Sequence, residues 1–286
     1  SKRKQELLFT SRIVMSVERI GIYAGKGVLP IKVAENIVKS NKKVFIIAIK
    51  GLTDRNVEKF PHQWMRFGQI GLAMRLLKKN NCKKLVIIGG AKIPNFFFLF
   101  PDFFGLRLFF SLFIIRKSGD AEIIKTIINY IEKKVKIKIV GADNFLADIL
   151  MTKGNLTNTD IKSSNINDID LAIKTCSEIG NSDTGQACIV SNGKVIIAED
   201  INGTDFMLYK AIKEKNHEIS GGFLIKMLKP IQDKRVDLPT VGLNTLKLIN
   251  ELGLNGIVLE DKKAFLVDKD KMIEYANQKN LFIYGI

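Results

Sequence analysis

The chain has 286 residues, of which 46% are hydrophobic. It is long enough for two ordinary domains and too apolar for a disordered protein. A net charge of +16 favours phosphate-rich partners such as nucleic acid, anionic lipid headgroups or phosphorylated substrates, although compositional drift explains it equally well. Two histidines and three scattered cysteines exclude a histidine-rich metal site and a thiolate zinc site.

Short apolar runs alternate with amphipathic segments through the first half of the chain. This alternation predicts an α/β fold with a Rossmann-like parallel sheet over residues 19–150, preceded by an extension at residues 1–18. We expect strands at residues 19–24, 43–51, 84–90 and 136–141, and helices at 29–40, 70–79 and 119–135.

Residues 151–167 are polar and rich in Asn, Ser and Thr, which is typical of a linker between domains. Residues 168–286 are expected to form a C-terminal domain of mixed α/β structure. The expected elements are a helix at 168–180, a hairpin about residues 191–193, a helix capped by Thr204, a strand at 221–229, a helix at 240–252, two strands within 255–267, a helix at 269–279 and a strand at 281–285.

Residues 96–110 contain eight of the eighteen phenylalanines of the chain. A membrane-spanning helix needs roughly 20 mostly apolar residues, but Pro101, Asp102 and Arg107 interrupt this stretch. A span is therefore not expected. The residues leave three roles open for these rings, namely core packing, binding of an apolar ligand and a contact with a membrane surface.

A glycine-containing turn, Gly25-Lys26-Gly27, follows the first expected strand. Glycines permit close backbone approach, and the N-terminus of the next helix offers free N–H groups to an anion. The spacing is not that of a GxGxxG motif, because Leu29 and Pro30 stand where the third glycine would lie. A tight turn and a phosphate cradle with Lys26 as its cation are both consistent with these residues.

The most concentrated polar segment is KPIQDKRVDLPTVG at residues 229–242. If residues 233–237 are extended, Asp233, Arg235 and Asp237 share one face because side chains alternate along a strand. That arrangement would suit a site for a divalent cation and a phosphate. An internal salt bridge between Arg235 and Asp237 that braces a loop is equally compatible with the spacing.

Further predictions concern two residues of this segment and two other polar segments. Lys229 is expected to help Arg235 clamp a phosphate, and Thr240 to cap the helix that follows. Residues 183–186, DTGQ, and residues 202–205, NGTD, lie beside predicted strands, and turn formation explains each of them simply.

In chain order, the segments IGIYAGKGVLP, RKSGDAEIIK, DTGQACIV, NGTDFML and KPIQDKRVDLPTVG resemble the UDP-2,3-diacylglucosamine pyrophosphatases of the LpxI type, from about residue 20 to residue 286. The resemblance implies a two-domain enzyme of lipid A biosynthesis. Such enzymes cleave UDP-2,3-diacylglucosamine to 2,3-diacylglucosamine 1-phosphate (lipid X) and UMP with Mg²⁺, in a chamber between the domains. The chain departs from the family at Ala121, where relatives often carry a second acid, and at Ile93, where many carry Arg.

The resemblance implies that Asp237 is needed for hydrolysis, and we expect it to be the Mg²⁺ ligand and to act with Arg235 as a catalytic residue. Contacts with the substrate are expected from Gly25, Lys26, Gly27, Asp205, Lys229, Gln232 and Thr240.

The expected partners are a diacylated UDP-sugar and, by a peripheral contact from the cytoplasm, the inner membrane. No nucleic-acid partner is expected, and the sequence leaves the oligomeric state open, a homodimer included. Two other classes stay open as alternatives. A nicotinamide-linked oxidoreductase suits the first domain apart from its glycine spacing, and a basic nucleic-acid-binding protein suits the charge but lacks an aromatic-basic motif.

Overall fold

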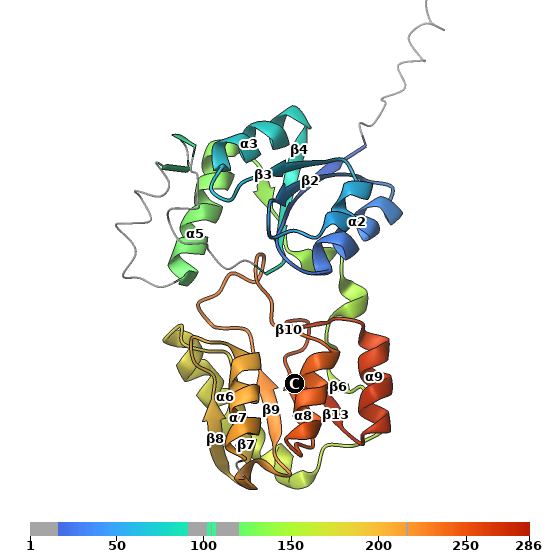
Figure 1. The fold of residues 1–286 in the computed structure, drawn as a ribbon, viewed down its shortest axis with the longest axis vertical. Helices are drawn as coiled ribbons and strands as arrows, with labels where there is room; N and C mark the ends of the chain where they lie inside the picture. The colour runs from blue at the N-terminus through green and yellow to red at the C-terminus, as the bar shows by residue number, and fades with distance from the viewer. Residues whose placement is uncertain (1–16, 91–101, 104, 107–119, 216) are drawn as a thin grey trace, which may run out of the picture.

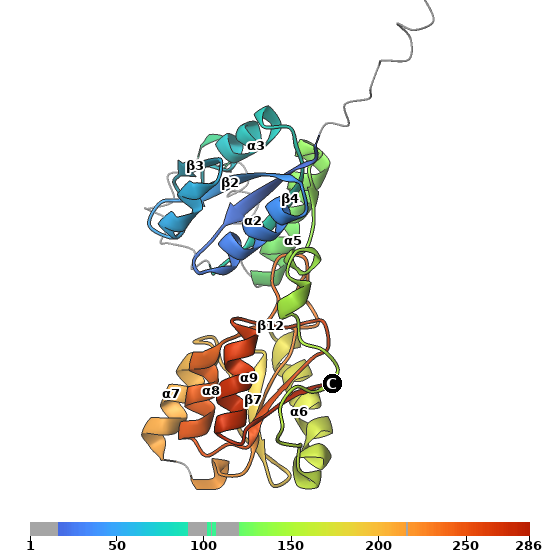
Figure 2. The same cartoon turned by 90° about the vertical axis from the view of Figure 1, so that its right-hand side faces the viewer.

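The computed structural model describes residues 17–90, 102–103, 105–106, 120–215 and 217–286. Most of the expected N-terminal extension and most of the phenylalanine-rich stretch lie outside the described residues. The described chain forms two α/β bodies that follow one another along the long axis of the molecule (Figures 1 and 2).

The N-terminal body is built on a five-stranded sheet in the order β3-β2-β1-β4-β5, in which every pairing is parallel. The predicted parallel α/β architecture is thus confirmed. Strand β3 was missed, because its sequence HQWM carries His and Gln and lacks a continuous apolar run. The strands are β1 (Arg19–Ala24), β2 (Lys43–Ile49), β3 (His62–Met65), β4 (Cys82–Ile88) and β5 (Lys138–Ile139).

Helices cover both faces of this sheet, which explains why β2 is apolar along nearly its whole length. Ile46 packs in a cluster with α2, whereas its neighbour Ile47 packs in a second cluster with α3 and α5. The helices are α2 (Leu29–Lys39), α3 (Ile70–Lys79) and α5 (Asp120–Tyr130), which continues as a π-helical turn (Ile131–Val135); short 3₁₀ turns lie at Arg55–Lys59, Ala142–Asn144 and Ala147–Ile149.

The C-terminal body contains a six-stranded sheet in the order β6-β13-β11-β9-β7-β8, whose three central strands β13, β11 and β9 run parallel. The outer pairings are antiparallel, so the sheet is mixed, as predicted. The strands are β6 (Gly154–Asn155), β7 (Ala187–Ser191), β8 (Lys194–Ala198), β9 (Phe223–Lys226), β11 (Gly256–Leu259) and β13 (Phe282–Gly285), beside a separate parallel pair, β10 (Thr240–Val241) and β12 (Phe265–Leu266).

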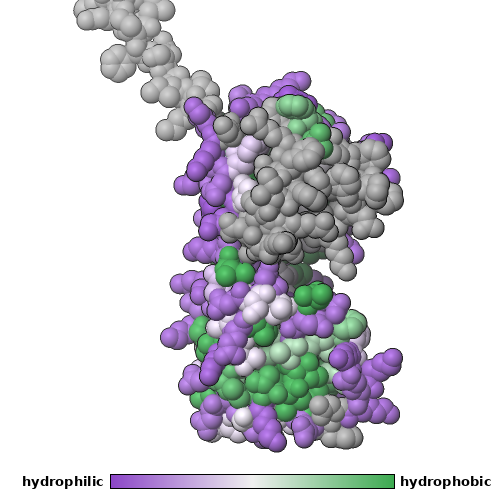
Figure 3. Space-filling view, turned by 90° about the vertical axis from the view of Figure 1, so that its left-hand side faces the viewer, coloured by the Kyte–Doolittle hydropathy of each residue, from purple (hydrophilic) through white to green (hydrophobic). Residues whose placement is uncertain are grey.

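Three helices pack on one face of this sheet and a single long helix packs on the other. The helices are α6 (Ser163–Asn181), α7 (Thr204–Glu214), α8 (Leu243–Glu251) and α9 (Lys269–Gln278), with a 3₁₀ turn at His217–Ile219. Figure 3 shows hydrophobic residues gathered on one face of this body, and Ile201 and Phe206 are among its exposed apolar side chains.

Several local expectations are confirmed and others are wrong. The β7–β8 hairpin turns at Asn192 and Gly193, which both have positive φ as a type I′ turn requires. Helix α7 starts at Thr204 itself, so this residue is not the N-cap, and its hydroxyl donates a hydrogen bond to Glu199. Helix α6 begins at Ser163, so the last residues of the expected linker are helical.

None of the helices in the described part of the chain combines the length and the apolar character that crossing a bilayer requires.

Candidate functional site

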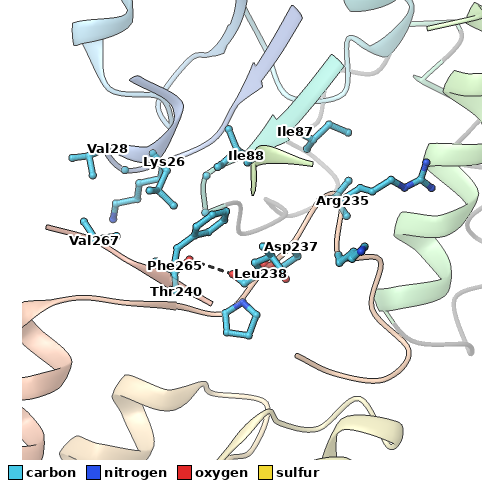
Figure 4. Close-up of a pocket in the computed structure, with 18 of the residues that line it drawn as sticks. Lys26, Val28, Ile87, Ile88, Arg235, Asp237, Leu238, Thr240, Phe265 and Val267 are labelled. Atoms are coloured by element: carbon cyan, nitrogen blue, oxygen red, sulfur yellow. Dashed lines mark hydrogen bonds between the residues drawn. The ribbon is translucent and has the colours of Figure 1, made fainter. Parts of the chain in front are cut away.

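A cavity of about 560 Å³ lies where the two bodies face each other (Figure 4). Its volume is within the range of about 300–1,000 Å³ that is typical of small-molecule sites. The N-terminal body contributes the turn after β1 and the end of β4, and the C-terminal body contributes the end of β9 and the loop 234–240. The cavity is therefore shared by the two bodies, as a chamber between domains requires.

The sheet topology explains why the cavity lies at this place. From β1 the chain builds outwards through β2 and β3 on one side, and then through β4 and β5 on the other, so the strand order reverses between β1 and β4. Open α/β sheets bind ligands at the carboxyl ends of the strands beside such a reversal. The turn that follows the carboxyl end of β1 and the carboxyl end of β4 both line the cavity.

The glycine turn after β1 packs directly on the turn after β4. Lys26 and Gly90 exchange two backbone hydrogen bonds of 2.8 and 2.9 Å. A Cβ atom on Gly25 would lie 2.5 Å from the carbonyl oxygen of Gly89, so the close approach of these turns requires glycine. Gly25 thus serves the tight turn, whereas Lys26 and Gly27 line the cavity.

The loop that carries Asp237 is anchored in the core of the other body. Leu238 and Phe265 are buried in the apolar cluster formed by β1, β2 and α2. Phe265 also donates its N–H to the carbonyl oxygen of Pro239. The neighbouring Asp237 is therefore held at the boundary between the two bodies.

Residues 233–237 form a turn, so the predicted extended strip is wrong. The N–H groups of Val236 and Asp237 both donate to the carbonyl oxygen of Asp233, at 3.0 and 3.3 Å. The Asp233 carboxylate also accepts a hydrogen bond from the N–H of Arg235, which is the local bonding that makes aspartate favour turns over strands.

The Arg235 side chain makes two ion pairs, neither of them with Asp237. Its guanidinium lies 2.7 Å from Asp233 and 3.0 Å from Glu132 of the π-helical turn. The hydrogen bond from Arg235 lowers the pKa of the Asp233 carboxyl below its usual value. Figure 4 shows the guanidinium pointing away from Asp237, so the alternative of an Arg235–Asp237 bridge is also wrong.

Asp237 lies on the cavity wall, with its carboxylate accessible from the cavity. The surrounding protein desolvates this carboxylate and raises its pKa, an effect that the charges of Lys226 and Lys229 partly offset. The side-chain amide of Gln232 donates a hydrogen bond to Asp237 Oδ2. The carboxylate is thus oriented by a neutral donor and leaves its second oxygen, Oδ1, for another contact.

The remaining predicted residues are spread around this centre. Thr240 lies in β10 and lines the cavity, and α8 begins later with Gly242 as N-cap, so the expected cap is wrong. Lys229 makes an ion pair with Asp183 at 2.8 Å and does not line the cavity. Asp205 lies in the first turn of α7, outside the cavity wall.

Sequence reasoning missed several residues of the cavity wall, above all Lys226 and Gln186. Lys226 closes the apolar strand β9, and a charged residue at the end of a buried strand was the available signal. Gln186 ends the DTGQ segment, which was interpreted only as a turn. The β7–β9 pairing brings the two positions together, since Met227 donates its N–H to the Gln186 carbonyl.

The residues beside Asp237 are suited to Mg²⁺. Gln232 Oε1, and also Gln186 Oε1, are buried oxygens without a hydrogen-bond partner. No group of three His, Cys, Asp or Glu side chains that could hold a metal occurs within the described ranges. Mg²⁺ commonly uses one or two protein carboxylates and completes its shell with water and substrate phosphates, so Asp237 with a neighbouring amide oxygen meets its requirements.

Comparison with known proteins covers nearly the whole chain. A sequence model of the LpxI N-terminal domain matches residues 19–149, and one of the LpxI C-terminal domain matches residues 152–284. The UDP-2,3-diacylglucosamine pyrophosphatase LpxI of Caulobacter vibrioides is 29% identical over 276 residues, which are 94% of this chain and 98% of that protein.

Similarity to solved structures is slight. The Bordetella bronchiseptica enzyme WbmG in complex with NAD and UDP is 19% identical over 28% of this chain and 27% of its own, with a TM-score of 0.24. The biotin carboxylase domain of the Hydrogenobacter thermophilus 2-oxoglutarate carboxylase is 11% identical over 68% of this chain and 40% of its own, with a TM-score of 0.23. Neither likeness supports an argument about the site. The two domain matches, in the expected order, show instead that the chain belongs to the LpxI family of UDP-2,3-diacylglucosamine pyrophosphatases.

Proposed function

We propose that this protein hydrolyses the pyrophosphate bond of UDP-2,3-diacylglucosamine in the cavity between its two bodies, releasing UMP and 2,3-diacylglucosamine 1-phosphate. The family supports the reaction. The observation that carries the assignment to this cavity is the position of Asp237, whose carboxylate faces a volume shared by the turn after β1 and the carboxyl ends of β4 and β9.

The reaction joins a water oxygen to one phosphorus and breaks the bond between that phosphorus and the bridging oxygen. Pyrophosphate is stable because its negative oxygens repel a nucleophile, so catalysis depends on charge neutralisation and alignment. Lys26 and the backbone of Gly27 are placed on the N-terminal wall to receive phosphate oxygens. Arg235 holds the shape of the Asp237 loop through Asp233 and the opposing Glu132.

Mg²⁺ is the cofactor that we propose for this site, with Asp237 as its carboxylate ligand and Gln232 Oε1 as a neighbouring oxygen donor. When bound, the ion would neutralise phosphate charge and lower the pKa of a coordinated water. Gln232 orients the Asp237 carboxylate through its amide N–H. The charges of Lys226 and Lys229 offset part of the rise in pKa that desolvation of this carboxylate causes.

Part of the cavity wall is apolar and suits the diacylated sugar. The N-terminal wall presents Val28 and Ile87, and the opposite wall presents Phe265 and Val267. Each buried methylene contributes about 0.8 kcal/mol, so two acyl chains gain from an extended apolar surface.

We also propose that the protein works at the cytoplasmic surface of the inner membrane, where a diacylated substrate resides. The net charge of +16 favours anionic headgroups. Phe103, in the described part of the phenylalanine-rich stretch, is 76% exposed. Co-sedimentation with phosphatidylglycerol vesicles tests this contact. Binding that salt weakens supports it, and no binding at low salt contradicts it.

The decisive experiment for the reaction is release of UMP from UDP-2,3-diacylglucosamine by the purified protein with Mg²⁺, followed by chromatography. Running the reaction in ¹⁸O-labelled water identifies which phosphorus is attacked, because the label appears in only one product. Absence of UMP release by the wild-type protein would overturn the proposed function.

A further inference from the structure

We propose that Lys226 is a further catalytic residue, whose ammonium group binds a non-bridging oxygen of the substrate pyrophosphate. This inference rests on the proposed function and adds a phosphate-binding group from the C-terminal body. Sequence reasoning assigned the phosphate contacts to Lys26, Lys229 and Arg235, but two of these three cations are engaged elsewhere.

The position of Lys226 follows from the sheet. Phe223, Leu224 and Ile225 are fully buried in β9, and Lys226 is the residue at which this strand reaches the cavity. Its neighbours in register are Ala187 on β7 and Leu259 on β11, neither of which carries a charge. The strand thus presents a single ammonium group at its carboxyl end, where parallel strands in α/β proteins place ligand-binding groups.

The ammonium group keeps donors available for a ligand. It makes one long hydrogen bond of 3.4 Å, to the carbonyl oxygen of Thr240. A lysine ammonium has three N–H donors, so two are left over. Among the ion pairs between described residues, none includes Lys226, whereas Lys229 is paired with Asp183 and Arg235 with two carboxylates.

Burial lowers the pKa of Lys226, and three acidic groups oppose this effect. These groups are Glu199, Asp205 and Asp237. Glu199 is already bonded to the Thr204 hydroxyl at 3.0 Å and to the Gln186 N–H at 3.3 Å. A partly desolvated cation with spare donors, beside an acid on the same cavity wall, is suited to a phosphate oxygen that arrives with the substrate.

Lys226 also contacts the backbone that leads to Asp237, so a purely structural role must be distinguished from phosphate binding. Uridine and inorganic pyrophosphate separate the two roles. Pyrophosphate depends on the cations of the cavity, whereas uridine carries no phosphate. A collapsed loop would weaken the binding of both ligands, but a missing ammonium group would weaken only the binding of pyrophosphate.

The test compares Lys226→Met, Lys226→Arg and the control Lys194→Met. Lys194 is an exposed lysine of β8 that pairs in register with Ser191, the last residue of β7. Ala187, the β7 neighbour of Lys226, is the first residue of that strand, so the two lysines lie at opposite ends of β7. Calorimetry measures the dissociation constants of pyrophosphate with Mg²⁺ and of uridine, and UMP release gives kcat and KM.

We expect Lys226→Met to weaken the binding of pyrophosphate about 10-fold. It should also lower kcat/KM about 10²–10³-fold, which is the typical effect of removing one hydrogen-bond donor to a charge that develops in the transition state. Its affinity for uridine and its melting temperature should match those of the control, and Lys226→Arg should recover part of the pyrophosphate affinity. Unchanged pyrophosphate binding in Lys226→Met, or equal losses for both ligands, would overturn the inference. If the wild type releases no UMP while pyrophosphate binding still depends on Lys226, the proposed function fails and the phosphate-binding role stands.

Discussion

The amide of Gln232 donates a hydrogen bond to the carboxylate of Asp237, while the oxygen of the same amide is buried without a partner. One side chain therefore orients the acid and leaves an oxygen donor unused beside it. An unpaired buried oxygen costs about 1–3 kcal/mol, so its retention is expected where a ligand completes its bonding. This pair is the local basis of the proposed Mg²⁺ site.

Replacing Gln232 should therefore affect the metal requirement more than the fold. We expect Gln232→Leu to raise the Mg²⁺ concentration for half-maximal UMP release about 10- to 100-fold, as loss of groups around a metal ligand commonly does. Titration of activity with Mg²⁺ measures this effect. Gln63→Leu is the control, because Gln63 is an exposed residue of β3 that lies outside the cavity wall. An unchanged Mg²⁺ requirement in Gln232→Leu would count against the site.

Asp237 should show a trade-off between activity and stability. Asp237 is accessible from the cavity, but the surrounding protein desolvates its carboxylate and raises its pKa above the ordinary value of 3.8, so the folded state binds this proton more tightly than the unfolded state does. The stability that this proton contributes is fully present below the pKa that Asp237 has in the unfolded state. It is lost as the pH rises through the higher pKa that Asp237 has in the folded state. The ionised carboxylate therefore destabilises the protein at neutral pH.

We expect Asp237→Asn to melt at a higher temperature than the wild type near pH 7.5, with the difference shrinking towards pH 4. The same variant should lose activity at least about 100-fold, in line with removal of one electrostatic catalytic group. Thermal unfolding across this pH range checks the first effect and UMP release the second. A variant that melts lower at neutral pH would show that the carboxylate is not penalised by burial.

The two-sided pairing of Arg235 should stabilise the fold only while its acids are ionised. Arg235 lowers the pKa of Asp233, so this stabilisation is present above the unfolded pKa and is lost as the pH falls through the folded pKa. We expect Arg235→Met to lower the free energy of unfolding by a few tenths to about 1 kcal/mol at pH 6, because the paired side chains are partly exposed. The difference from the wild type should narrow below pH 4.

Urea denaturation at several pH values measures this effect. Lys210→Met serves as the control, since it removes a 3.8 Å pair with Glu214 in which both side chains are more than half exposed. A constant difference between wild type and Arg235→Met at every pH would show that the ion pair is not its source.

The turn at Gly27 should be sensitive in function as well as in stability. Gly27 and Gly51 both have positive φ, at 101° and 77°, and a Cβ on either would meet nothing within 4 Å. Alanine at each position should cost about 1–2 kcal/mol of backbone strain. Only Gly27 lines the cavity, so only Gly27→Ala should also raise KM for UMP release. Equal KM values in the two variants would exclude Gly27 from substrate binding.

Phe103 offers a test of the lipid contact. We expect Phe103→Ser to weaken turnover of the diacylated substrate more than turnover of a deacylated analogue, since the ring would meet the acyl chains or the lipid surface. Phe206→Ser on α7 is the matched control, because Phe206 is also an exposed phenylalanine but lies in the C-terminal body. Equal losses with both substrates would defeat the lipid-contact hypothesis.

The repeating apolar strands made the parallel sheet of the N-terminal body and the β7–β8 hairpin predictable. Strand β3 was not predictable, because its residues carry no continuous apolar run and its strand structure depends on pairing with β2. The local structure at residues 233–237 was predicted wrongly, since alternation of side chains was assumed where Asp233 bonds to its own backbone neighbours. Lys226 escaped notice because its relation to Asp237 arises only when β9 and the loop fold back on one another.

The central claim is that Asp237 acts on a pyrophosphate bound between the two bodies. The most direct measurement is UMP release from UDP-2,3-diacylglucosamine by wild type and Asp237→Ala, with Mg²⁺ or with a chelator, beside calorimetric binding of the substrate to the variant. We predict turnover only for the wild type with Mg²⁺, and substrate binding by the variant that is largely retained. Full turnover by Asp237→Ala, or turnover that the chelator does not affect, would contradict the account.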